Sequence, residues 1–589
     1  MSGETGTGEL VVGPLLRHVD ETSATLWVEV DRAATVSVEA DGRRWSAPTF
    51  AVHGHHYAVV AVDGLGPGET HPYVLRVDDR QVWPEPASAY PPVVLRTHDH
   101  EAPLRIAFGS CRVSVPHDAE HHASFGVDAL RTYGMHLATY PDGPDGPDMS
   151  DRLEERAPDL LLLLGDQVYA DETSEAMREF IAVRRDPEQA PWWELKDYEE
   201  YAELYRLAWS DPATRWLLST VSSAMIFDDH DVRDDWNTSA RWRAEMAEKP
   251  WWHDRIVGAL ASYWVHQHLG NLSPAERATD PVYRLVLEHE GPDELDLSAV
   301  LDRFAERADE EPASYRWSFA RELGPQARLV VVDSRAARVL EPERRSMIDD
   351  EEMAWLDRQL HGDVRHLLIG TSLPYLLSPG LHHLEATTEA LAEGLRGRTG
   401  HELGEWVRRA ADTEHWAAFQ GGFRQVGEML VETATGGRGR VPDSVVLLSG
   451  DVHHSYVAEA WPDPASEAAQ RPGPHSRILQ AVCSPIRNPL PWFMKAGVRL
   501  VSRGRARPTG RLLGRLVPRS PLHWEVTQGP WLDNLLAVLE VDGSDLRIRW
   551  STGEVVDGDH ARPRWRTLVE LGPRPGVPAG RRTASLRRR

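Results

Sequence analysis

Through the first part of the chain, apolar and polar positions alternate in short runs, the pattern of half-buried β-strands. Turn-forming pairs such as Asp41-Gly42 and Asp63-Gly64 separate the runs. The predicted strands cover residues 24–30, 35–40, 57–62 and 71–77. Short strands with frequent turns are typical of a small β-sandwich. We therefore expect an all-β domain of the immunoglobulin or fibronectin type over residues 1–98.

Beyond residue 98 the pattern changes to apolar runs that each end in a polar loop. Runs that are apolar throughout are typical of strands covered on both faces. These runs lie at residues 104–112, 159–171, 224–231, 328–335, 366–374 and 444–454. Helix-like segments at 198–207 and 353–360 alternate with them, which predicts a layered α/β domain over residues 99–560.

Two further segments of this part of the chain have a distinctive composition. Residues from about 172 to 222 are rich in Trp and acids, and they predict a helical insertion that forms a wall or lid over a site. Near the carboxyl end, residues 535–541 and 545–550 flank Asp542-Gly543 and predict an antiparallel hairpin. Residues 561–589 are basic, and we expect them to form a disordered tail.

Composition and charge narrow the classes of function. The formal net charge of −26 argues against a nucleic-acid-binding protein, because a polyanion would be repelled. Metal cations bound at a site make the electrostatic potential there positive, so a protein with this net charge can still bind a phosphate substrate. Only two cysteines, Cys111 and Cys483, are present, and a disulfide framework is not expected. Without a signal peptide or an apolar stretch near the ~20 residues that span a bilayer, a cytoplasmic protein is expected.

The candidate chemistry lies in the loops that follow the apolar runs. Because the carboxyl ends of strands in an open α/β sheet meet at one edge, these loops are expected to converge. In the first, GDQVY, Gly165 permits a sharp turn and sets Asp166 at the strand tip, where its carboxylate can bridge two cations. Tyr169 can reach the same centre as a phenolate. The alternative is a helix-capping Asp166 with a packed Tyr169.

A second loop, DDHDVRDDW, crowds carboxylates around His230. Such crowding raises the free energy of the carboxylates unless bound cations neutralise their charge. The alternative interpretation is a solvated acidic loop. A third loop, GDVHH, offers Asp451 as an oxygen ligand and His453 as a nitrogen ligand. Cys111 in FGSCR adds a thiolate ligand, with a buried small hydrophobe as the alternative interpretation.

The motifs GSC, GDxxY, DDHD and SGDVHH, in this order, resemble those of the alkaline phosphatase D (PhoD-like) metallophosphatases. The resemblance implies a β-sandwich followed by an α-β-β-α metallophosphoesterase domain, and a ferric ion paired with calcium or another divalent ion. It places Cys111, Asp166, Tyr169 and His453 around the iron. It places Asp166, either Asp234 or Asp235, and Asp451 around the second ion.

This chain departs from that family in two respects. Extracellular members carry an asparagine ligand after a DDHE motif, whereas Asp234 and Asp235 stand here and Asn237 follows. A carboxylate in place of an amide changes the charge of the site, so the identity of the metal stays open. Those members also carry a twin-arginine export signal that this sequence lacks, so the resemblance implies no localisation.

The expected reaction is hydrolysis of a phosphate mono- or diester by a metal-activated water. His230 and Asp229 are the candidate catalytic residues, and Arg112 and Arg335 are candidates to neutralise phosphate oxygens. A structural salt bridge is the alternative for each arginine. A catalytically degenerate scaffold protein is the competing functional interpretation.

Residues 487–519 form a basic, partly apolar span without any acidic residue. Basic segments that carry Trp can lie in the interface of anionic membranes, which predicts weak peripheral membrane contact. The alternative is a loop that pairs with the protein's own carboxylates.

Overall fold

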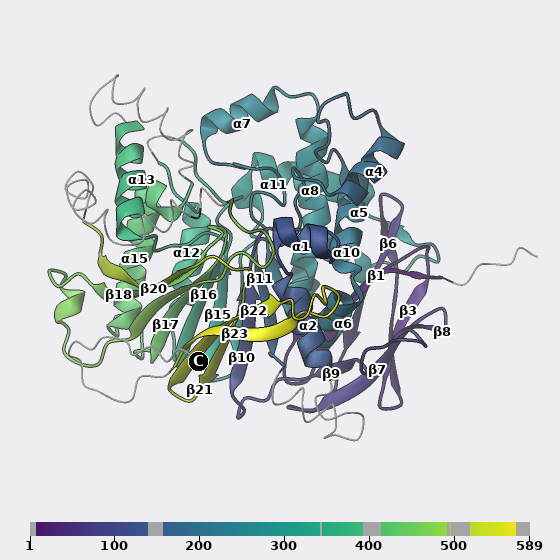
Figure 1. The fold of residues 1–589 in the computed structure, drawn as a ribbon, viewed down its shortest axis with the longest axis horizontal. Coiled ribbons are helices and arrows are strands. Elements are labelled where there is room, and N and C mark those ends of the chain that lie inside the picture. The colour runs from purple at the N-terminus through teal and green to yellow at the C-terminus, as the bar shows by residue number, and fades with distance from the viewer. Residues whose placement is uncertain are drawn as a thin grey trace, which may run out of the picture.

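The computed structural model describes residues 8–139, 157–341, 344–392, 414–491, 495 and 519–572. It is a mixed α/β protein with several sheets, and the amino-terminal strands lie at one end, far from helices α13 and α15 (Figure 1). Within the described residues no helix is long and apolar enough to cross a membrane.

The amino-terminal part is all-β, as the alternating pattern predicts. One sheet has the order β1-β2-β6-β5-β13 and the other the order β4-β3-β7-β8, with β9 paired to β7. Its immunoglobulin or fibronectin type stays a prediction. The strands are β1 (Leu10–Val19), β2 (Ala24–Val30), β3 (Thr35–Ala40), β4 (Arg43–Pro48), β5 (Phe50–Val52), β6 (His55–Val62), β7 (Thr70–Val77), β8 (Arg80–Trp83), β9 (Val94–Arg96) and the distant β13 (Leu295–Asp296).

Two larger sheets follow, with the orders β12-β11-β10-β21-β22-β23 and β14-β15-β16-β17-β19-β18-β20. Strands β10, β11 and β12 pair in parallel, as do β15, β16, β17 and β19. Their bounds are β10 (Leu104–Gly109), β11 (Leu160–Leu164), β12 (Ser223–Ile226), β14 (Phe319–Leu323), β15 (Ala327–Val332), β16 (His366–Thr371), β17 (Ser444–Ser449), β18 (Ser455–Pro462), β19 (Arg477–Val482), β20 (Leu522–Trp531), β21 (Leu536–Asp542), β22 (Asp545–Glu554) and β23 (Arg564–Leu571).

The five leucines of β11 show why these strands are apolar throughout. Leu162 and Leu164 pack with Leu368 and Val446 of the seven-stranded sheet, so the two sheets face each other. Leu161 and Leu163 belong instead to a cluster that also holds helical side chains and the core of the amino-terminal sheets. A strand buried on both faces has no solvent side to carry polar residues.

Helices cover the outer faces of both sheets. On the six-stranded side lie α1 (Ala119–Phe125), α2 (Ala129–Ala138), α4 (Glu175–Arg184), α5 (Tyr198–Trp209), α6 (Pro212–Thr220), α7 (Ala240–Ala247), α8 (Trp252–His266), α9 (Pro274–Thr279), α10 (Tyr283–Leu287) and α11 (Ser298–Glu310). The seven-stranded sheet is covered by α12 (Asp350–Gln359), α13 (Pro379–Ala392) and α15 (Gln420–Ala434). Short 3-10 turns are His268–Gly270, Pro312–Ser314, Trp416–Ala418 and Ala468–Gln470.

The predicted helical insertion at about 172–222 corresponds to α4, α5 and α6, which lie between β11 and β12, and α7 to α11 follow between β12 and β14. The predicted start of the tail needs correction. Residues Arg564–Leu571, which were expected in a disordered tail, form β23 and pair with β22. Pairing to an existing sheet edge supplies hydrogen bonds that composition alone does not reveal. Residues 573–589 lie outside the described part of the chain.

Candidate metal centre

Three loops that follow parallel strands meet at one point, as the sequence predicts. Cys111 follows β10, Asp166 follows β11, and Asp451 and His453 follow β17. All four have positive φ, between 49° and 60°, which few residues other than glycine adopt. Such backbone conformations cluster at functional sites, where the surrounding structure holds them.

Small residues allow this convergence. A Cβ atom at Gly165 would lie 2.6 Å from the Cβ of Asp228, and Gly165 has a φ of 98°. A Cβ atom at Gly450 would lie 2.0 Å from the Oγ of Ser110. Because neither contact is possible for a larger residue, both motifs need glycine where the loops touch.

Cys111, Asp166 and His453 form a first group, in which one ligand atom from each lies within 4.8 Å of the others. The thiol of Cys111 donates to Oδ2 of Asp166 at 3.4 Å and accepts from Oγ of Ser484 at 3.2 Å. Burial, with added repulsion from Asp166 and Asp451, raises the pKa of the Cys111 thiol well above its ordinary value. A bound cation removes that penalty and favours the thiolate.

A second group consists of four carboxylates, again with ligand atoms within 4.8 Å: Asp166, Asp228, Asp229 and Asp451. Burial, together with the neighbouring carboxylates, raises the pKa of Asp166 and of Asp228 well above the ordinary range. Oδ1 of Asp166 and Oδ2 of Asp228 are buried without a hydrogen-bond partner. Unpartnered buried carboxylate oxygens that face one another are what a cation site requires, so these residues fit bound metal.

Arg335 neutralises part of the charge of this group. Its guanidinium forms ion pairs with Asp228, with Asp229 at 3.1 Å and with Glu414, and its side chain is fully buried. Although burial works against the charge, these carboxylates raise the pKa of Arg335 well above its ordinary value. Because all three partners are protein carboxylates, Arg335 holds the site together, as in the salt-bridge alternative.

His230 lies beside the first group, with its ring 4.7 Å from the ring of Tyr169. Its Nδ1 is 2.9 Å from Oδ1 of Asp171, a residue that the sequence motifs did not single out. Tyr169 is buried and packs with Cys111, which is consistent with its predicted position. Asp231 braces the loop, because its Oδ2 accepts from the backbone nitrogens of Asp166 and Asp228 at 2.8 and 2.9 Å.

Another histidine, His415, lies next to the site, and the sequence motifs do not indicate it. Its Nδ1 lies 3.0 Å from Glu385, and its Nε2 lies 3.6 Å from Oδ2 of Asp451. His415 does not follow an apolar run in the sequence, as the other candidate residues do, so only the fold brings it to the site.

The predicted role of Arg112 needs correction. Arg112 faces away from the metal centre, because its side chain is buried and binds Asp128 at 3.0 Å, the carbonyl of Ala208 and the hydroxyl of Thr214. This arginine therefore ties α2 and α6 to the loop after β10 and is not free to bind phosphate.

The predicted ligands Asp234 and Asp235 are not in the group with Asp166 and Asp451, but Asp234 forms a third group with Asp229 and His230, again with ligand atoms within 4.8 Å of one another. The side chain of Asp234 is 64% exposed and lies 4.0 Å from Nε2 of His230, while Asp235 donates its backbone N–H to Asp229. Within this loop Asp228, Asp229 and Asp231 are buried, Asp235 is half-buried and Asp234 is exposed.

The predicted membrane segment lies almost entirely outside the described residues. At its start, Arg487 is buried and donates to the carbonyls of Val115 and Pro116, so this cation is not available to a membrane surface.

Comparison with known proteins assigns the chain to a family. A model of the PhoD-like phosphatase family matches residues 144–492, more than half of the chain. The chain belongs to the PhoD-like phosphatase family. A domain of unknown function (DUF7800) matches residues 7–95. No curated protein sequence matches the chain.

Solved structures also resemble this PhoD-like phosphatase. One described as the structure of PhoD is 14% identical and has a TM-score of 0.57, covering 97% of this chain and 91% of that one. The purple acid phosphatase PPD1 from yellow lupin (Lupinus luteus) seeds is 8% identical with a TM-score of 0.46, covering 92% and 71%. The first likeness shows a shared fold, and family membership supports a phosphoesterase that binds metal.

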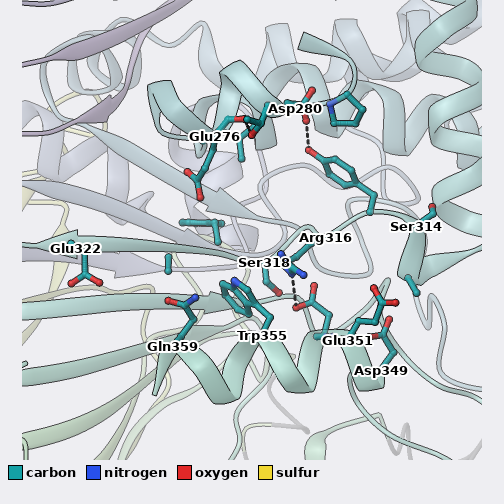
Figure 2. A pocket seen from close by; sticks show the side chains of 18 residues that line it. Glu276, Asp280, Ser314, Arg316, Ser318, Glu322, Asp349, Glu351, Trp355 and Gln359 are labelled. Atoms are coloured by element: carbon teal, nitrogen blue, oxygen red, sulfur yellow. Dashed lines mark hydrogen bonds and ion pairs between the residues drawn. The ribbon is translucent and has the colours of Figure 1, made fainter. Parts of the chain in front are cut away.

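A groove of about 640 Å³ lies elsewhere on the PhoD-like phosphatase and is not its metal centre. It runs between α9, β14 and α12, and Figure 2 shows the carboxylates of Glu276, Glu322 and Asp349 along it. None of the candidate ligands lines this groove.

Proposed function

We propose that this chain hydrolyses phosphate mono- or diesters at a two-metal site made of the first group (Cys111, Asp166, His453) and the second, carboxylate group. The observation that carries the proposal is the position of Asp166, which belongs to both groups and has an unpartnered oxygen. One carboxylate shared by two cations is the arrangement that two-metal phosphoesterases use to hold their ions close together.

The ligand types support two different ions. Cys111, Tyr169, Asp166 and His453 combine thiolate, phenolate, carboxylate and imidazole donors, which suit a transition metal such as Fe³⁺. The second group supplies carboxylates alone, from Asp166, Asp228, Asp229 and Asp451, which suit Ca²⁺ or another hard divalent ion. When bound, such ions polarise phosphate oxygens and lower the pKa of water.

The protein residues around the metals have separate tasks in this proposal. Asp171 holds Nδ1 of His230, so Nε2 is the nitrogen left to exchange a proton with the leaving group or with water. Arg335 keeps Asp228 and Asp229 in place by ion pairs. His415, held by Glu385, orients Asp451.

Metal analysis with two chromogenic assays tests the proposal. Purified protein should contain two metal ions per chain and hydrolyse p-nitrophenyl phosphate or bis-p-nitrophenyl phosphate, with the ratio of rates showing whether mono- or diesters are preferred. Asp166→Asn should lose metal and activity, whereas Asp350→Asn, at a 94% exposed position, should keep both. Protein that binds metal but hydrolyses neither ester would favour the scaffold interpretation.

A further inference from the structure

Three buried arginines meet where the amino-terminal sheets contact the phosphatase region. Arg17 lies on β1, Arg277 on α9 and Arg321 on β14, and their exposed fractions are 0%, 3% and 5%. All three guanidinium groups point to one turn, residues 267–272, although they come from distant parts of the sequence. Three cations in so small a buried volume repel one another strongly.

The partners of these arginines are all neutral. Arg17 donates to Oγ of Ser223 at 3.0 Å and to Oδ1 of Asn271 at 3.3 Å. Arg277 donates to the carbonyl of Leu272 at 2.9 Å and to Oγ1 of Thr25 at 2.8 Å. Arg321 reaches only the carbonyls of Gly270 and Asn271, at the long distances of 3.4 and 3.5 Å.

Several donors in this cluster are left without any acceptor. Nε and Nη1 of Arg321 and Nε of Arg17 are buried and have no hydrogen-bond partner. His18 and His98, whose charges interact with Arg321, each bury one ring nitrogen without a partner. An unsatisfied buried donor costs free energy, and one on a charged group costs more.

Among the described residues, no carboxylate lies within 4.0 Å of these three guanidinium groups. The buried Arg112, Arg255 and Arg335, in contrast, each have an acidic partner within that distance. Glu276 is the carboxylate that interacts electrostatically with Arg321. Its side chain, however, accepts from the backbone of Ser273 in the capping box of α9 and faces the groove (Figure 2). Burial, then repulsion by Arg321, lowers the pKa of Arg17 to about 9.

We propose that a small inorganic anion binds in this cluster, accepting hydrogen bonds from Nε and Nη1 of Arg321 and lying close enough to Arg17 to offset its charge. The anion neutralises the buried cations and supplies acceptors that the protein does not. Because Arg17 belongs to the amino-terminal sheets and Arg321 to the phosphatase region, the bound anion ties the two regions together. The site is separate from the metal centre and does not depend on the proposed reaction.

The packing around the cluster favours a monatomic ion. A Cβ atom at Gly270 would lie 1.8 Å from Nε of Arg17, so this side of the guanidinium has almost no free space. Chloride, with its compact shape and several donors around it, suits such a site better than a tetrahedral oxyanion.

Two experiments on the full chain test the proposal: bromide soaking of crystals and thermal unfolding in solution. Crystals soaked in sodium bromide should show an anomalous-scattering peak beside Arg321. The thermal midpoint should be higher in sodium chloride than in sodium gluconate of equal ionic strength, by about 2 °C. A rise in sodium phosphate alone that Arg321→Met abolishes would equally support an anion site in the cluster, with an oxyanion as the ligand.

Variants assign the effect to the cluster. Arg321→Met should abolish the chloride-dependent rise, and Arg277→Met should reduce it, whereas Arg307→Met, at a 69% exposed position on α11, should leave it unchanged. If Arg321→Met does not fold, the bromide peak in the unaltered protein still decides. Crystals without such a peak, together with equal midpoints in all three salts, would overturn the proposal.

Discussion

Nδ1 of His230 lies 2.9 Å from Oδ1 of Asp171, and the same carboxylate accepts from the backbone nitrogen of Asp234 at 2.6 Å. Asp171 thereby joins the loop after β11 to the loop after β12 and fixes the orientation of the imidazole. A histidine that must exchange a proton at Nε2 needs such a partner on its other nitrogen.

Asp171→Asn should lower kcat about 10- to 100-fold with little change in KM, since partners that orient active-site groups have effects of this size. Metal content should stay unchanged, because Asp171 is in neither ligand group. Steady-state kinetics and elemental analysis on the same samples check this. Loss of metal in parallel with activity would show that Asp171 maintains the site and does not act through His230.

Asp166→Asn and Asp228→Asn should differ in which metal they lose. Asp166 belongs to both ligand groups, so its replacement should remove both ions and nearly all activity. Asp228 belongs to the carboxylate group alone, so its replacement should remove the divalent ion and leave the transition metal bound. Elemental analysis after gel filtration measures both. The same metal content in the two variants would contradict the division into two groups.

If Cys111 and Tyr169 bind ferric iron, the purified protein should absorb visible light through ligand-to-metal charge transfer. Tyr169→Phe should shift or abolish that band, because it removes the phenolate. Absorption spectra of the two proteins at equal iron content test this. A colourless, active protein without iron would contradict the iron assignment and leave the phosphoesterase proposal standing.

Arg112→Met should destabilise the fold by about 3–5 kcal/mol, because it leaves the buried carboxylate of Asp128 without its charge partner. The activity of the molecules that stay folded should be nearly unchanged, since this arginine faces away from the metals. Chemical denaturation and active-site-normalised kinetics measure the two effects. A large loss of kcat at full stability would restore Arg112 as a phosphate ligand.

Acid should weaken the fold partly through His266. Burial lowers the pKa of His266 from 6.5 to about 3, and its ring stacks on Tyr205 at 4.3 Å. Between pH 6.5 and 3 the unfolded chain binds a proton that the folded chain does not, so stability falls as pH falls, by up to ~1.4 kcal/mol per pH unit.

The variant His266→Phe should therefore have a shallower dependence of unfolding free energy on pH below 6.5. His253→Phe, at a position 65% exposed, is the matched control and should keep the full slope. Denaturant titrations at several pH values give the slopes. Equal slopes in the two variants would show that other groups cause the acid sensitivity.

The loops that carry the candidate ligands were predictable because a strand is recognised from the pattern of neighbouring residues. The leucine run of β11 and the apolar run of β17 identify strands from adjacent residues alone, and Gly165 and Gly450 mark the turns that follow. Parallel strands then bring Asp166 and Asp451 to one edge without any further information. For the same reason the predicted hairpin corresponds to β21 and β22 in the structure.

The sequence by itself therefore determined which loops carry the metal-binding residue types and the family that they resemble. Only the tertiary structure decided which carboxylates of the DDHDVRDDW loop face the centre, because the brace between Asp231 and the backbone of Asp166 joins residues far apart in the chain. It also turned Arg112 toward Asp128 and brought His415 to Asp451. The direction of a side chain depends on long-range contacts that no local pattern records.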